Sequence, residues 1–314
     1  MANKLIVSAA PHITSADSTS KIMQRVCIAL VPSLIASVIW FGISALIVTA
    51  VTVVACVLFE YAYCKLMGRE VTINDFSAVV TGMLLAFNMP SGMPVWMAIV
   101  GAFIAIVIVK QLFGGLGFNF ANPAIVGRIA LALGYTGAMT TYVFPNNGID
   151  ALSAATPLGV ASELGAGEYV TLLLGNHGGV LGETCAIALI VGGLYLIVTK
   201  VISPMIPVSY LATVAVLSFA FGMDPIVQLL SGGVLLGAFF MATDYVTSPT
   251  TEKGKLIFGI GLGVITMLIR AFGTMNEGVS FAILLMNLLV PYIDVLTRQD
   301  KLGIAKVKKG GAAK

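Results

Sequence analysis

The chain has 314 residues, of which 58% are hydrophobic and only 10% are charged, and its formal net charge is +3. Soluble domains carry about 25% charged residues, so this composition cannot cover a surface that faces water. It excludes a soluble protein, a disordered chain and a basic nucleic-acid-binding protein. Several apolar runs approach the roughly 20 residues that cross a bilayer, which predicts a polytopic, all-α membrane protein.

The amino-terminal arm, residues 1–21, has no continuous apolar core followed by a small-residue cleavage site, so we expect it to be retained in the cytoplasm. A first membrane half is predicted over residues 22–135. Proline, glycine and charged residues divide it into five spans, at about 22–41, 43–65, 75–90, 93–111 and 121–135. Glycines and a proline cluster between Phe113 and Ala124 and predict a helix break before the fifth span.

An outer loop is predicted over residues 136–182, a second membrane half over 183–298 and a basic cytoplasmic tail over 299–314. The second half contains five spans, at about 183–201, 207–222, 226–243, 256–272 and 279–297. A second glycine cluster, Gly175 to Glu183, predicts another break before the sixth span. Because five spans precede the loop and five follow it, the halves would enter the membrane in opposite senses, as in a 5+5 inverted repeat of about ten transmembrane helices.

Broken helices at membrane depth need protein or a cavity to satisfy their polar backbone groups, so the two breaks indicate a ligand or ion path. An ordinary turn at the membrane interface is the alternative. Every Lys and Arg except Arg128 and Arg270 falls in a segment that is cytoplasmic if the amino terminus lies inside. We therefore expect a multi-pass protein of the cytoplasmic membrane, with both termini inside and the loop 136–182 on the outer face.

Two acidic residues are candidates for an ion path. Glu183 begins the sixth span, and Asp244 ends the eighth beside Thr247. Carboxylate, hydroxyl and carbonyl oxygens suit a hard cation or a proton relay; otherwise these residues cap helices or face water. Glu60 and Asp294 are interpreted as paired structural charges, and His177 as a loop residue. The four cysteines have no metal-ligand spacing, so no bound metal is expected.

The outer loop contains Asp150-Ala-Leu-Ser-Ala-Ala-Thr-Pro157. Proline disfavours helix at the residue before it, so Thr156 is expected to be extended, with an accessible hydroxyl. On local grounds the segment is a turn. Its pattern, D-x-x-S-x-A-T, also matches the sequence recognised by the flavin transferase that joins the phosphate of FMN to a threonine hydroxyl.

Six segments in order resemble the NqrB/RnfD family of membrane subunits from redox-driven ion pumps, and the resemblance covers nearly the whole chain. They are residues 10–23, 75–90, 110–128, 178–189, 237–251 and 277–287. The short amino-terminal arm is similar to the D subunit of the Rnf complex rather than to the longer B subunit of the Na⁺-pumping NADH:quinone oxidoreductase. Tyr245 stands where the family usually has proline, which predicts a looser turn, and Met205 stands where relatives often have a basic residue.

The resemblance implies covalent FMN on Thr156, with Asp150 and Ser153 in the motif read by the transferase. It implies a flavin that relays electrons between reduced ferredoxin and NAD⁺ within a complex that moves Na⁺ or H⁺. Arg128 would stabilise an anionic flavin or its phosphate, or else partner a carboxylate or broken-helix carbonyls. A second, non-covalent flavin, riboflavin, occurs in relatives, and the two predicted breaks are its candidate sites.

The chain contains no nucleotide-binding fingerprint, so ferredoxin and NAD are expected on other subunits of the complex. We expect no catalytic residue and no stand-alone activity in this subunit of an oxidoreductase. Two alternatives stay open: a component of the Na⁺-pumping NADH:quinone oxidoreductase, and a non-redox channel or carrier for a small solute with the same fold. The flavin motif argues against a carrier.

Overall fold

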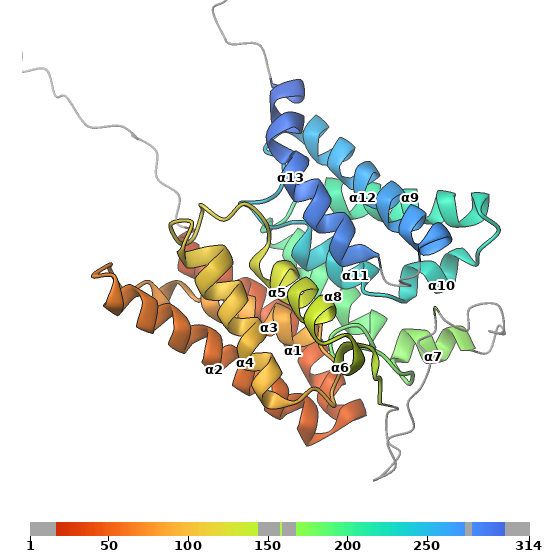
Figure 1. Cartoon of the computed structure of the whole chain (residues 1–314). Coiled ribbons are helices and arrows are strands. Elements are labelled where there is room, and N and C mark those ends of the chain that lie inside the picture. The colour runs from red at the N-terminus through yellow and green to blue at the C-terminus, as the bar shows by residue number, and fades with distance from the viewer. Residues whose placement is uncertain (1–16, 144–157, 159–167, 274–277, 299–314) are drawn as a thin grey trace, which may run out of the picture.

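A computed structural model describes residues 17–143, 158, 168–273 and 278–298, and its elements are helices (Figure 1). The first half contains α1 (Thr19–Phe41), α2 (Ile43–Leu66), η1 (Ile73–Asp75), α3 (Ser77–Phe87), α4 (Val95–Phe103), η2 (Ile104–Gln111), α5 (Pro123–Gly134) and α6 (Thr136–Thr140). The remainder contains α7 (Glu168–Leu174), α8 (Ala186–Val198), α9 (Met205–Ala220), α10 (Pro225–Leu230), α11 (Val234–Leu236), η3 (Gly237–Met241), α12 (Glu252–Phe272) and α13 (Val279–Thr297).

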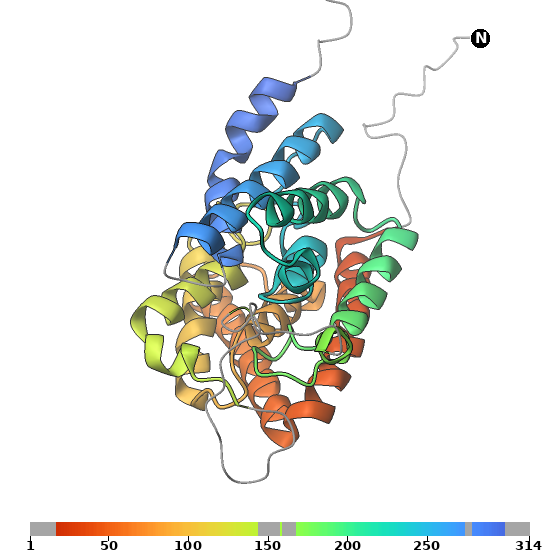
Figure 2. The same ribbon diagram turned by 90° about the vertical axis from the view of Figure 1, so that its right-hand side faces the viewer.

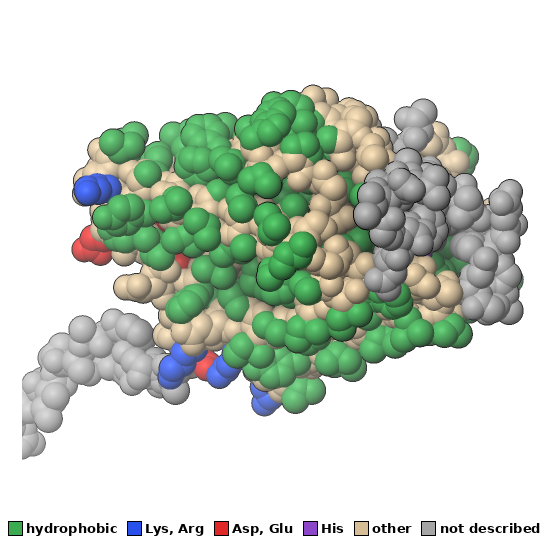
Figure 3. All heavy atoms as spheres, turned by 90° about the horizontal axis from the view of Figure 1, so that it is seen from below, with side chains coloured by type: hydrophobic (Ala, Val, Ile, Leu, Met, Phe, Trp, Pro, Cys, Tyr) green, Lys and Arg blue, Asp and Glu red, His purple; other side chains and the backbone are tan. Residues whose placement is uncertain are grey.

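Four helices, α1, α2, α12 and α13, are long and apolar enough to cross a membrane by themselves, and several shorter apolar helices lie between them. Their outward faces carry large apolar side chains, such as Ile39 at 64% and Phe219 at 80% exposure. Figure 3 shows one face covered mainly by hydrophobic side chains, with the visible charged side chains gathered towards one end. An apolar surface of this extent suits a lipid environment and confirms the membrane class.

The helices of the two halves form two groups, coloured red to yellow and green to blue in Figures 1 and 2. In the first group α2 packs against α3 and α4, and in the second α12 packs against α9 and α13. The groups meet where α1 contacts α8 and where α5 contacts α13. At the first contact Gly192 is required, because a Cβ there would lie 2.2 Å from the Ala29 carbonyl oxygen.

Both predicted glycine-rich breaks are non-helical. Residues 112–122 form turns between η2 and α5, with left-handed backbone at Gly114, Gly115 and Gly117. The second break extends further than predicted, because α8 begins at Ala186 rather than at Glu183. The predicted eighth span is also divided: α10 ends at Leu230, and Gly232 and Gly233 adopt left-handed φ angles of 71° and 69° before α11 begins.

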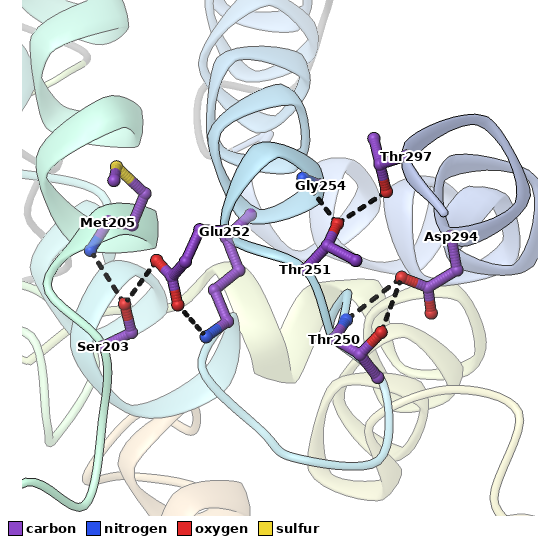
Figure 4. Close-up of polar contacts among 9 residues, drawn as sticks. Ser203, Met205, Thr250, Thr251, Glu252, Gly254, Asp294 and Thr297 are labelled. Carbon is purple, nitrogen blue, oxygen red and sulfur yellow. Dashed lines mark hydrogen bonds and ion pairs between the residues drawn. The ribbon is translucent and has the colours of Figure 1, made fainter. Parts of the chain in front are cut away.

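The helix ends that carry Lys65, Lys110, Lys200 and Lys255 are brought together at one end of the molecule, here called the basic end. Hydrogen bonds there join segments that are distant in sequence (Figure 4): Ser203 Oγ donates to Glu252 at 3.3 Å, and the Thr250 amide donates to Asp294 at 3.0 Å. Lys255 donates to Glu252 at 2.7 Å, which lowers the pKa of that exposed carboxyl. The opposite end, called the arginine end, contains buried Arg128 and half-buried Arg270.

Candidate functional site

Thr156, Asp150 and Ser153, the predicted flavin site, lie outside the described residues. Leu158, two residues after Thr156, is described and contacts the break between α10 and α11. A Cβ built on Gly232 would lie 2.4 Å from Leu158 Cδ1 and 2.3 Å from Arg270 Nη2, so both side chains pack directly on this glycine. Leu158 therefore lies at the break in the predicted eighth span.

Arg270, in the last turn of α12, closes this break. Its Nη1 donates to the Gln228 carbonyl at 2.6 Å and to Gln228 Oε1 at 2.9 Å, and its Nη2 donates to the carbonyls of Ser231 at 2.9 Å and Gly232 at 3.2 Å. The Gln228 carbonyl lies in the last turn of α10 and those of Ser231 and Gly232 lie just after it, where carbonyls lack helical partners. A planar guanidinium can bind several of them at once. Sequence reasoning missed this role, although the Ser-Gly-Gly sequence at 231–233 signalled the break.

Arg128 and Glu183 lie close to this point. Arg128 is 5% exposed in α5, and its Nη1 donates to the hydroxyl of Ser280 at the start of α13. Glu183 is 7% exposed and lies near enough to both Arg128 and Arg270 for their charges to interact. Glu183 Oε2 lies beside Gly233, 3.8 Å from a Cβ built on that glycine. Glu183 caps no helix here; it is a buried acid between two cations.

The chain leading to Glu183 is hydrogen-bonded to α1 and to the C-terminal end of α3. The Leu181 amide donates to the carbonyl of Met89, just beyond α3, at 3.0 Å, and the Gly182 amide donates to the carbonyl of Phe87, the last residue of α3, at 2.9 Å. Ser37 of α1 donates to the Leu181 carbonyl. These hydrogen bonds satisfy backbone groups of Leu181 and Gly182, as non-helical backbone inside a helix bundle requires.

Four buried side-chain atoms at this end have no partner among the described residues. They are His177 Nε2, Thr184 Oγ1, Ser231 Oγ and Arg270 Nε. His177 follows α7 as the predicted loop residue, yet it is only 7% exposed. Because buried polar atoms are normally hydrogen-bonded, this group is suited to water or a polar ligand.

A pocket between the halves opens at the basic end and has a cavity volume of about 90 Å³. Aromatic and aliphatic side chains from α1, α3, α8 and η3 form most of its wall. Its polar groups are Ser77, Thr81, Lys110, Asn119, Asn122, Thr243 and Asp244. The first predicted break contributes Leu116, Asn119 and Asn122, so that break does line a cavity. We call this cavity the inner pocket.

The two π-helical segments end at the inner pocket. In η2 the Leu112 amide donates to the Val107 carbonyl at 3.0 Å, and in η3 the Ala242 amide donates to the Gly237 carbonyl at 2.8 Å. Such i to i−5 turns are uncommon and often occur at functional sites. They bring Lys110 on one side, and Phe239 and Phe240 on the other, into the pocket wall.

Lys110 and Glu60 form a buried ion pair at 2.7 Å, with side chains 2% and 0% exposed. The prediction that Glu60 is paired is thus confirmed. Lys110, which the charge pattern placed in a cytoplasmic loop, lies at the basic end but is inside the protein. Its partner is 50 residues away, so no local pattern could identify it. Asp294 is bound by the amide and hydroxyl of Thr250 rather than by a described basic side chain.

Asp244 lies in the pocket wall and accepts hydrogen bonds from the Val246 amide at 3.4 Å and Thr247 Oγ1 at 3.1 Å. This arrangement makes Asp244 the first residue of a turn rather than a helix cap. The next residue, Tyr245, donates its hydroxyl to the Val201 carbonyl beyond α8. A hydrogen bond therefore joins this turn to the segment after α8, at the position where the family usually has proline.

The sequences of known proteins are similar to this chain along nearly its whole length. A family model described as NQR2, RnfD, RnfE matches residues 6–303. The D subunit of the Na⁺-translocating ferredoxin:NAD⁺ oxidoreductase complex of Acetobacterium woodii is 47% identical, and the match covers 98% of each chain. The D subunit of the proton-translocating complex of Clostridium ljungdahlii is 43% identical, over 96% of this chain and 97% of its own. The D subunit of an ion-translocating oxidoreductase complex from Alcanivorax borkumensis is 35% identical, over 98% and 99%.

Proposed function

The chain belongs to the NQR2, RnfD, RnfE family, and we propose that it is the D subunit of an Rnf-type complex that transfers electrons between ferredoxin and NAD⁺ and moves Na⁺ or H⁺ across the membrane. The observation that carries this proposal is 47% and 43% identity over nearly the full length of two such subunits. The chain itself supplies membrane helices and buried polar sites, whereas ferredoxin and NAD would bind partner subunits.

Everted membrane vesicles test this function. A strain that lacks the chain should lose NAD⁺ reduction by reduced ferredoxin together with ion uptake, and the wild-type gene should restore both. The two relatives differ in coupling ion, so uptake is measured with ²²Na⁺ and with a pH probe. Na⁺ coupling predicts ²²Na⁺ uptake that resists a protonophore. Quinone reduction in place of NAD⁺ reduction would favour the quinone-linked pump, and solute transport without electron transfer would favour a carrier.

We further propose that the membrane domain is a 5+5 inverted repeat of ten spans. The pattern of helix packing supports this, because α2 packs on α4 as α9 packs on α12, and α3 packs on α5 as η3 packs on α13. Equivalent helices meet each other, α1 with α8 and α5 with α13, as a two-fold relation requires. The basic end would face the cytoplasm and the arginine end the outside, in agreement with the distribution of positive charge.

We propose that Thr156 carries FMN through a phosphoester, with Asp150 and Ser153 read by the flavin transferase. Thr156 and Leu158 are two residues apart, so their Cα atoms are at most about 7 Å apart. Leu158 packs beside Arg270, and Arg128 lies in the same region, so positive charge is available for the flavin or its phosphate. Digestion and mass spectrometry should find the mass of FMN, less water, on the peptide that contains Thr156.

The inner pocket suits a second, non-covalent flavin. Its wall combines aromatic rings with amides and hydroxyls, as a flat ring system with one polar edge requires. In the described pocket wall the cation Lys110 is paired with Glu60 and Asp244 is acidic, so no unpaired positive charge is available there for a phosphate, which favours riboflavin over FMN. Acid extraction of the purified complex should release riboflavin. A bulky Val26→Trp substitution, which fills the pocket from α1, should abolish that release and leave covalent flavin unchanged.

Glu183 and Asp244 remain our candidates for an ion path. They lie at opposite ends of the contact between the halves, Glu183 at the break before α8 and Asp244 at the inner pocket. A path through this contact would join the buried polar atoms of the arginine end to the basic end. Glu183→Gln and Asp244→Asn should each reduce ion uptake per electron transferred, whereas an unchanged ratio would remove that residue from the path.

A further inference from the structure

One N–H donor of the Lys110 ammonium group has no acceptor among the described residues. An ammonium group carries three N–H donors, and two are used: Nζ donates to Glu60 Oε2 at 2.7 Å and to Ser77 Oγ at 2.6 Å. No other described residue accepts from Nζ. The side chain is 2% exposed and lines the inner pocket. A buried donor without a partner is costly, so the third N–H marks a place for a ligand atom.

The surrounding hydrogen bonds determine which member of this ion pair faces the inner pocket. Thr72 Oγ1 donates to Glu60 Oε1 at 2.8 Å, on the side away from the pocket. Ser77 donates its only hydroxyl proton to Asp75 Oδ1 at 2.5 Å, so its oxygen must accept from Lys110. Lys110 and Ser77 line the pocket, whereas Glu60 does not. The positive end of the pair is therefore the end presented to a ligand.

An ion pair with only a structural role would not need its cation to face a pocket with one N–H donor unused. Taking both charges out of water costs more than their attraction returns unless hydrogen bonds satisfy the remaining donors and acceptors. Here Glu60 is satisfied by Lys110 and Thr72, and the incomplete partner is the one that faces the pocket. The π-helical turn of η2, which places Lys110 in the wall, is itself a local departure from the preferred helix.

We propose that Lys110 is a ligand-binding residue of the inner pocket: its third N–H donates to an acceptor atom on the polar edge of the ligand, and its charge stabilises the reduced, more negative form. This inference rests on the proposed second flavin. A flavin presents carbonyl and ring-nitrogen acceptors along one edge, and positive charge beside that edge favours reduction. Asp244 in another part of the wall accepts hydrogen bonds, so the acceptor edge faces Lys110 and donor groups of the ligand face Asp244.

The test uses the purified complex. The double variant Glu60→Gln with Lys110→Met removes both charges without leaving one of them buried alone. We expect its dissociation constant for riboflavin to rise about tenfold or more, as loss of a charge-assisted hydrogen bond implies. The midpoint potential of the extractable flavin, measured by spectroelectrochemistry, should shift to a more negative value. Lys110→Arg, which keeps the charge, should retain most of the wild-type potential.

The matched control neutralises an exposed ion pair at the same end. Arg25 and Asp17, with side chains 32% and 48% exposed, form an ion pair at 2.9 Å. The double variant Asp17→Asn with Arg25→Gln should change neither the dissociation constant for riboflavin nor the midpoint potential. The covalent flavin band reports a folded subunit, and Glu60→Gln with Lys110→Gln serves if the first double variant does not assemble. Unchanged affinity and potential in an assembled, uncharged variant would overturn the role of Lys110. Absence of extractable flavin from the wild type would instead overturn the second flavin itself.

Discussion

Gly182 permits the closest contact between the halves at the arginine end. A Cβ there would lie 2.3 Å from the Phe87 Cβ, and the neighbouring backbone is hydrogen-bonded to residues beyond α3. Gly182→Ala should therefore destabilise the protein by about 1–3 kcal/mol, the usual cost of overpacking. The measurement is the thermal unfolding midpoint in detergent. Gly134→Ala is the control, because a Cβ at Gly134 meets nothing within 4 Å; equal midpoints for the two variants would contradict this role.

Arg270 shows how one side chain can stabilise a broken helix. Its four hydrogen bonds satisfy carbonyls and the side-chain amide between Gln228 and Gly232. Arg270→Met would leave buried carbonyls without donors, at a cost of about 1–3 kcal/mol for each. We expect faster amide exchange in α10 and α11, measured by hydrogen–deuterium exchange. Protection like that of the wild type would show that the break is stable without the guanidinium.

At the scale of elements, α10 depends on its first residues as well as on Arg270. Asp224 accepts from the Ile226 amide at 2.8 Å and from the Val227 amide at 3.5 Å, and the Tyr169 hydroxyl of α7 also donates to it. The hydrogen bond from Tyr169, and then the two amides, hold the pKa of Asp224 below its usual value. Asp224→Ala should cost about 0.5–2 kcal/mol, as loss of a helix cap does.

The sign of the pKa shift gives this variant a pH dependence. A carboxyl whose pKa is lower in the folded protein contributes stability above its unfolded pKa of about 3.9, and that contribution disappears as the pH falls through the folded value. The difference in unfolding midpoint between wild type and Asp224→Ala should therefore be constant near neutral pH and should shrink below about pH 4. A difference in unfolding midpoint that grew as the pH fell would contradict the lowered pKa of Asp224.

The sequence predicts the positions of the helices better than it predicts the helix breaks and the buried polar contacts. Each of the ten expected spans contains a helix, because apolar runs between glycines, prolines and charges report burial directly. The break at 231–233 was missed because short apolar helices on either side read as one run. Burial of Lys110 and the carbonyl contacts of Arg270 could not be predicted, since each depends on partners brought close only by folding. The flavin motif lies outside the described residues and stays a prediction.

At the scale of the whole molecule, the arginine end is expected to face outward. Single cysteines at Thr141 and Lys253, both exposed and at opposite ends, can be introduced into a variant whose half-buried Cys27 and Cys185 are alanine. A membrane-impermeant maleimide should label position 141 in intact cells and position 253 only after lysis, because positively charged segments stay inside. The reverse pattern would overturn the orientation.

Coupling of electron transfer to ion movement also belongs to the whole molecule. A redox change moves an ion only if it shifts the balance between two states with different access. The contact between the halves is the natural place for such a change, because the inner pocket and the two candidate acids, Glu183 and Asp244, lie along it. This role depends on a flavin being attached to the outer loop.

The most direct test of the central claim is the in-gel fluorescence of the denatured chain, produced together with a flavin transferase, in wild type and in Thr156→Val. We expect a fluorescent band that survives denaturation in the wild type and is absent from the variant at equal protein. A wild-type chain without fluorescence, in cells where the transferase labels a control substrate, would contradict the covalent flavin and with it the redox role proposed for this protein.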